Sequence, residues 1–143
     1  MKRLSLVFLL ILALPACSLL ELGDGSDGNV TLVNRSGEPI YYHGLELESS
    51  HLVDPMTSFD PDDSPFPRLD DGASVTLTPD EIEAYKPGDG VRFLAYALRP
   101  PRQEEEPPPD AEKVASLVAF PTATGEELRR NDGRVVVRDL GVE

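Results

Sequence analysis

Six short segments of the chain follow the two-residue period of a β-strand, and no long segment has the period of an amphipathic helix. One of them, 91–98, is apolar on both faces, which is typical of a central strand. Turn signals separate the segments, so we expect an all-β fold: a small antiparallel β-sandwich, immunoglobulin-like, or a partly open barrel. The six segments are 30–33, 39–43, 73–77, 91–98, 114–120 and 134–138.

A threonine followed three residues later by a glutamate occurs at two places that predict short helical turns. Each pair is typical of a capping box at the start of a helix. The first pair, Thr78 and Glu81, predicts a helix of about two turns over 79–85. The second pair, Thr124 and Glu127, predicts a single turn. Neither helix is long enough to change the fold class.

The first two strand segments flank a short turn that contains glycine, which predicts a β-hairpin. Tyr41 and Tyr42 are adjacent in the second segment, so their side chains face opposite sides of the sheet. We therefore expect at most one of them in the core, and the other as a cross-strand partner or a binding aromatic. His43 follows them and is expected at the surface or half-buried. These three residues are weak candidates for a binding site.

Two segments between the strands are polar. Residues 48–71 are rich in Asp, Pro and Ser and predict a long acidic surface loop. Residues 100–110 are mainly Pro and Glu and predict an extended, solvated loop. Asp60, Asp62 and Asp63 are weak calcium candidates, because carboxylates this close could share an ion, although no known loop pattern fits them.

No residue constellation identifies a reaction or a cofactor. His43 and His51 are the only histidines, and Asp54 lies close to the second, but a zinc site needs three or four ligands. The chain has no Gly-x-Ser-x-Gly motif for a nucleophilic serine. We therefore assign no catalytic residue and expect no cofactor.

The start of the chain has the pattern of a secretory signal peptide. Lys2 and Arg3 are followed by an almost wholly apolar stretch, 4–14, and then by Pro15-Ala16-Cys17. A basic start, a short apolar region and a small residue before the cut define such a signal. The apolar stretch is too short to cross a membrane, which needs about 20 residues.

Leu14-Pro15-Ala16-Cys17 resembles the lipobox of bacterial lipoproteins, and the chain's single cysteine stands at the required position. The resemblance implies cleavage before Cys17 by signal peptidase II and acylation of both the cysteine and the new amino terminus. Ser18, where an aspartate would imply retention at the inner membrane, implies an outer-membrane location if the cell has one. An ordinary signal peptide cut after Ala16 is the alternative.

These boundaries predict a signal peptide over 1–16, a lipidated, glycine-rich, flexible tether over 17–29 and one β-rich domain over 30–143. The whole chain has a formal charge of −13, and residues 17–143 retain 11 basic and 26 acidic residues, a charge of −15. Such a chain repels phosphate backbones, which excludes nucleic acid as a partner. The acyl groups on Cys17 are then expected to hold the protein at the membrane without a basic patch.

The sequence therefore predicts a membrane-anchored extracytoplasmic lipoprotein that acts as a non-catalytic binding or structural module of the cell envelope, with an envelope protein as its candidate partner. The alternative is a small carboxylate-dependent hydrolase, or a calcium-binding domain, that uses the acidic 48–71 segment. A carboxylate with a raised pKa in a deep cleft would favour the enzyme. An acidic surface with an exposed edge strand would favour the module.

Overall fold

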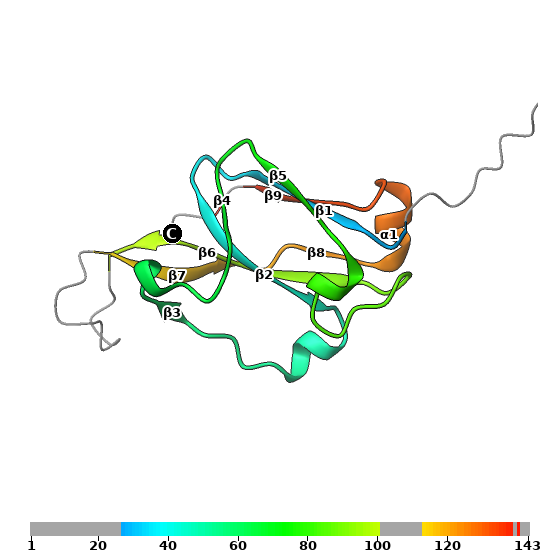
Figure 1. The fold of residues 1–143 in the computed structure, drawn as a ribbon, viewed down its shortest axis with the longest axis horizontal. Coiled ribbons are helices and arrows are strands. Elements are labelled where there is room, and N and C mark those ends of the chain that lie inside the picture. Colours follow the sequence, from blue (N-terminus) through cyan, green and yellow to red (C-terminus); the bar gives the residue numbers. More distant parts are fainter. Residues whose placement is uncertain (1–26, 101–112, 139, 141–143) are drawn as a thin grey trace, which may run out of the picture.

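The computed structural model describes residues 27–100, 113–138 and 140, which form two packed β-sheets (Figure 1). The signal peptide, Cys17 and almost all of the 100–110 segment lie outside the described residues. The strands are β1 (Val30–Arg35), β2 (Ile40–Glu46), β3 (Ser58–Phe59), β4 (Arg68–Leu69), β5 (Ser74–Leu77), β6 (Val91–Arg99), β7 (Val114–Ala119), β8 (Thr122–Ala123) and β9 (Arg134–Arg138). The helical elements are α1 (Gly125–Arg130) and the 3-10 turns η1 (Ser49–Leu52), η2 (Pro61–Asp63) and η3 (Pro79–Glu81).

The predicted all-β sandwich is confirmed. One sheet has the strand order β5-β1-β9, and the other has the order β3-β7-β6-β2-β4, with β8 also pairing β6. The six predicted strand segments correspond to β1, β2, β5, β6, β7 and β9. The three additional strands have two residues each, which is too short to show a period. One pair, β1 with β9, is parallel, whereas the other pairs are antiparallel.

The predicted hairpin between the first two strands is wrong, because β1 and β2 lie in different sheets. The chain turns a corner there, and the buried side chain of Asn34 fixes this corner. Its amide nitrogen donates to the carbonyl oxygens of Glu38, at 2.8 Å, and Leu69, at 3.0 Å. The amide thus joins the end of β1 to the corner and to β4 of the other sheet, which keeps β1 and β2 in separate sheets.

Both capping boxes are present, but only the second opens an α-helix, α1. The first opens the single turn η3 in place of the predicted helix over 79–85. The backbone becomes extended at Ile82, and Glu83 then bonds to β2: its N–H donates to Gly44, and its carbonyl accepts from Glu46. Pairing with the sheet thus takes the backbone groups that a second helical turn would need.

The main core lies between the two sheets and is mostly aliphatic. Phe93 is fully buried in it, opposite Gly44 on the neighbouring strand. A Cβ atom at Gly44 would lie 3.0 Å from the Phe93 ring, so the absence of a side chain there lets the ring pack against the sheet. The buried members are Val30, Leu32, Ile40, Tyr42, Leu69, Leu77, Ile82, Tyr85, Val91, Phe93, Ala95, Ala97, Ala123, Leu128, Val135, Val137 and Leu140.

A second apolar cluster covers the outer face of the six-stranded sheet. Part of the 48–71 segment runs from β3, at one edge of this sheet, to β4, at the other (Figure 1). We call residues 58–69 the strap. The strap buries Phe59 and packs Phe66 against the sheet. Most of the strap is still at least partly exposed, as are η1 and the residues up to 57, but Phe59 and Leu69 are buried, which the sequence did not predict.

Among the described residues, no helix has the length and apolar character needed to span a membrane.

Candidate functional site

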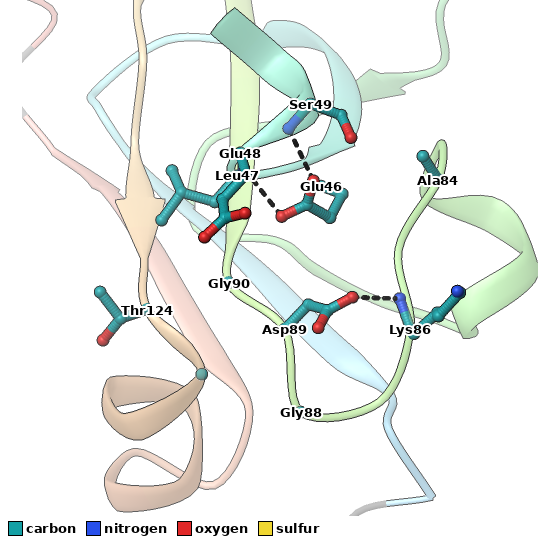
Figure 2. A pocket seen from close by; sticks show the side chains of 11 residues that line it. Glu46, Leu47, Glu48, Ser49, Ala84, Lys86, Gly88, Asp89, Gly90 and Thr124 are labelled. Atoms are coloured by element: carbon teal, nitrogen blue, oxygen red, sulfur yellow. Dashed lines mark hydrogen bonds between the residues drawn. The ribbon is translucent and has the colours of Figure 1, made fainter.

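A groove of about 530 Å³ opens at the end of the sandwich where α1 begins (Figure 2). Its walls come from the end of β2 and the start of η1, from the connection that leads to β6, and from the first residues of α1. The lining residues are Glu46, Leu47, Glu48, Ser49, Ala84, Lys86, Gly88, Asp89, Gly90, Thr124 and Gly125.

Glu46 is buried at the end of β2, and its carboxylate organises one wall of the groove. Its two oxygens accept hydrogen bonds from the backbone N–H groups of Glu48, at 2.7 Å, and Ser49, at 2.6 Å (Figure 2). These hydrogen bonds lower the pKa of Glu46. The group is therefore ionised at neutral pH and binds the start of η1, which is a structural use of a carboxylate.

The opposite wall is a tight turn closed by Asp89. The Asp89 carboxylate accepts from the backbone N–H of Lys86 at 3.2 Å, and the Asp89 N–H donates to the Lys86 carbonyl at 3.0 Å (Figure 2). Gly88 sits at a φ of 100°, which favours glycine. Its carbonyl lies so close to Gly125 that a side chain at that position would collide with it. The turn and the start of α1 are thus packed backbone to backbone.

Where the pKa of a described carboxyl group departs from its usual value, it is lowered. The pKa of Glu38 falls because Arg99 donates hydrogen bonds to it. The pKa values of Glu81 and Glu127 fall because each accepts from the backbone N–H of the threonine in its capping box. A general acid at neutral pH needs the opposite shift, so these carboxylates act as caps and ion-pair partners.

The weak calcium candidates do not form a cluster of ligands. Asp60 caps η2, its carboxylate accepting from the backbone N–H of Asp62 at 2.9 Å. Across residues 27–100, 113–138 and 140, no group of three or more His, Cys, Asp or Glu side chains is arranged to hold a metal ion. Asp63 and the two histidines are therefore not brought together with further ligands in this part of the chain.

Tyr41 and Tyr42 are both buried, so the expectation that at most one lies in the core is wrong. The reason is that both faces of β2 are covered, one by the second sheet and one by the strap. Tyr42 packs edge-on against Phe93 in the main core, with ring centroids 6.5 Å apart. Tyr41 faces the strap and lies directly opposite Tyr96 on β6, which confirms the cross-strand role.

His43 is half-buried, as expected, beside the strap. Its Nε2 lies 2.9 Å from the Glu83 carboxylate, and its ring stacks on Phe66 with centroids 5.0 Å apart. This residue therefore links β2, the η3 connection and the strap. Its contacts are those of a structural residue whose side chain remains partly exposed.

The sequence reasoning missed three arginines on the outer face of the three-stranded sheet: Arg35, Arg134 and Arg138. The signal was present, because Arg134 and Arg138 alternate with the buried valines of β9. What the sequence could not show is that β9 pairs with β1, which brings Arg35 next to them.

No protein-family model, curated protein or solved structure matches this chain. The function proposed below therefore rests on the residues of this chain alone.

Proposed function

We propose that this protein is a lipid-anchored component of the cell envelope that acts as a non-catalytic binding or structural module. The observation that carries the proposal is the position of the only cysteine. Cys17 directly follows a lipobox-like Leu14-Pro15-Ala16, and the first strand of a folded sandwich begins thirteen residues later, at Val30. This order of signal, lipidation site, spacer and domain suits a protein displayed on a membrane surface. Two acyl signals at the cysteine would give stable anchoring.

The hydrogen bonds of the carboxylates in the groove favour a binding or structural module over a carboxylate-dependent hydrolase. In the groove of Figure 2, Glu46 and Asp89 are bound to backbone N–H groups of the groove's own walls. These hydrogen bonds hold the walls of the groove in shape. The groove can still accommodate a polar ligand, through the exposed side chains of Glu48 and Lys86.

The edges of the three-stranded sheet also favour a binding module. β5 and β9 lie at its two edges, and within the described residues no further strand pairs with either. An unpaired edge is a template for binding an extended segment of another protein. Charged residues at both ends of β9, Arg134 and Arg138, restrict which partner can approach this edge.

The anchor is tested by a Cys17→Ala variant of the full chain expressed in bacteria. We expect the parent to partition into the detergent phase and the variant into the aqueous phase, because removal of the thiol removes the acylation site. A Ser18→Ala variant, changed one residue away, should behave as the parent. Equal partitioning of the parent and Cys17→Ala would contradict the lipid anchor.

The module is tested by crosslinking the tagged parent in cells and identifying what it captures, with Cys17→Ala as the control that lacks the anchor. One reproducible envelope protein, captured by the parent and lost in the control, supports a binding module. Replacement of the whole 48–71 segment is not a usable control, because Phe59 and Leu69 are buried. A Leu52→Ser variant can replace it as the control that changes this segment without unfolding the domain, since Leu52 is 90% exposed. Hydrolysis of a substrate by the purified chain would overturn the non-catalytic assignment.

A further inference from the structure

The outer face of the three-stranded sheet carries a basic groove on an otherwise acidic chain. β1 and β9 run parallel, and their inward residues Leu32, Val135 and Val137 belong to the main core. Side chains alternate along a strand, so the residues between these point outward. The outward residues, together with the turn before β9, line a groove of about 350 Å³: Val33, Arg35, Asn131, Asp132, Arg134, Val136 and Arg138.

The register of the two strands places the arginines in a defined arrangement. Arg35 lies directly opposite Arg138, so their backbones are about 5 Å apart. Arg134 lies four residues earlier on β9, about 13 Å along the strand. All three are exposed, whereas between them Val136 is half-buried and Val33 is buried, only 5% exposed. The result is three guanidinium groups around a floor of valine side chains.

The charges within the groove do not balance. Asp132 is the one carboxylate among the described residues that line the groove, so these three arginines and one aspartate contribute a local charge of +2. Elsewhere in the described chain, Arg68, Arg99 and Arg130 each form an ion pair with a carboxylate, but the three groove arginines form none with any described residue. Adjacent like charges repel, and an anion placed between Arg35 and Arg138 would relieve this repulsion.

The chemistry of the side chains selects the kind of anion. A guanidinium group presents a planar set of donors that matches a phosphate or carboxylate in a bidentate way. The half-buried Val136 leaves a small apolar surface beside the charges, which suits a ligand that joins a phosphate to a hydrocarbon group. Anionic lipid headgroups at a membrane surface have this combination.

The position of the groove agrees with a membrane ligand. β1 is the strand next to the proposed anchor in the sequence, and the N–H of Thr31 at its start donates to the carbonyl of Gly133 at 2.8 Å. The thirteen residues from Cys17 to Val30 can span at most about 45 Å. A domain held this close can lay the outer face of its three-stranded sheet on the lipid surface.

We propose that Arg35, Arg134 and Arg138 bind the phosphate groups of anionic lipids in the membrane that carries the anchor; this proposal rests on the proposed lipidation of Cys17. The charge of −15 on residues 17–143 repels such a membrane at long range. The groove acts only within a Debye length, about 8 Å in physiological salt, so the anchor must first bring the domain to the surface. The contact then orients the sandwich with its strap turned away from the membrane.

The test uses the chain from Cys17 onward, coupled through its only thiol to a maleimide lipid in nanodiscs. This coupling replaces the acyl anchor chemically, so the result does not depend on whether cells lipidate Cys17. A lipid with a paramagnetic headgroup broadens the NMR amide signals of residues close to the surface. On phosphatidylglycerol-containing discs we expect the signals of β1 and β9 to broaden more than those of β7. On pure phosphatidylcholine discs, or in high salt, we expect this face selectivity to be lost.

A triple variant, R35Q/R134Q/R138Q, should lose the selectivity on anionic discs. The matched control is R68Q/R129Q/R130Q, which removes the same number of charges at other exposed positions and should keep it. Amide spectra of both variants check that each is folded. Equal broadening of all faces by the parent, broadening of the strap side, or the same effect in both triple variants would overturn the lipid contact. Failure of the Cys17→Ala partitioning test would instead overturn the anchor.

Discussion

The six-stranded sheet has an apolar cluster on each face, and the two clusters are built differently. The inner cluster, which is the main core described above, lies between two regular sheets and consists mainly of Val, Leu, Ile and Ala. The outer cluster lies under the strap, and half of its six buried residues are aromatic: Tyr41, Phe59 and Tyr96. A single irregular segment covers less area than a second sheet. Large rings compensate for this, because each aromatic side chain buries 150–250 Å².

The two clusters are also held by different amounts of backbone pairing. The long strands around the inner cluster pair over four to seven residues, as in β1 with β5 and β2 with β6. The strap pairs through β3 and β4, which contribute two residues each. Segments with few backbone hydrogen bonds open first, at a lower free energy than the whole domain. We therefore expect the inner cluster to determine global stability and the outer cluster to determine whether the strap stays closed.

The largest expected effect comes from removing the most enclosed ring of the inner cluster. Phe93→Ala should lower the free energy of unfolding by about 3–5 kcal/mol, because two packed sheets cannot collapse into the space that the ring leaves. Urea denaturation measures this difference. The conservative change Phe93→Leu should cost about 1–1.5 kcal/mol. A loss below about 1 kcal/mol for Phe93→Ala would show that the inner cluster does not dominate.

A smaller effect is expected from the central ring of the strap. Phe59 contacts Tyr41, Phe66 and Tyr96, with centroids 5.0–5.6 Å apart. Phe59→Ala should cost about 2–3 kcal/mol, less than an inner ring, because the strap can move toward the vacated space. Hydrogen exchange should show the amides of the strap opening before those of β1.

Phe120→Ala is the matched control for this comparison. That ring is 51% exposed and belongs to neither cluster, so its removal should change stability by no more than about 0.5 kcal/mol. If Phe59→Ala opened the strap and β1 together, the two regions would form one cooperative unit.

The sequence was sufficient to predict the strands that form the regular parts of the fold. Alternating apolar residues identified the strands of both sheets, because each such strand has a face against the inner cluster. The same reasoning failed for the strap. Its two packed rings, the buried Phe59 and the partly buried Phe66, are separated by polar residues and prolines that give no period. Their burial depends on where the segment is attached, at β3 and β4, and that is a tertiary property.

The candidate sites show the same limit. Cys17 could be identified from the sequence because a signal is read locally, one residue after another. The basic groove could not, since Arg35 and Arg138 are about a hundred residues apart and meet only through the parallel pairing of β1 with β9. A net charge of −13 also conceals a local excess of positive charge, because the average over the chain carries no information about position.

The smallest expected effect lies at the corner between the sheets, outside both clusters. Arg99 donates two hydrogen bonds to the Glu38 carboxylate, at 2.6 and 2.7 Å, in a partly exposed position. Glu38→Gln should cost about 1 kcal/mol at neutral pH, since the pair is bidentate but remains partly solvated. Glu126→Gln, which removes a more exposed ion pair with Arg130, is the matched control and should cost less than about 0.5 kcal/mol.

The pH dependence of Glu38→Gln has a definite sign. Arg99 lowers the pKa of Glu38 in the folded chain below its usual 4.5, so the unfolded chain binds the proton more readily. The stabilisation by this pair is therefore complete above that pKa and is lost as the pH falls through the lower pKa of the folded state. Urea denaturation from about pH 6 to pH 3 should show the parent losing stability more steeply than Glu38→Gln, until the two converge in acid. Parallel curves would mean that the corner is held by Asn34 alone, and that the ion pair contributes nothing to the junction of the two sheets.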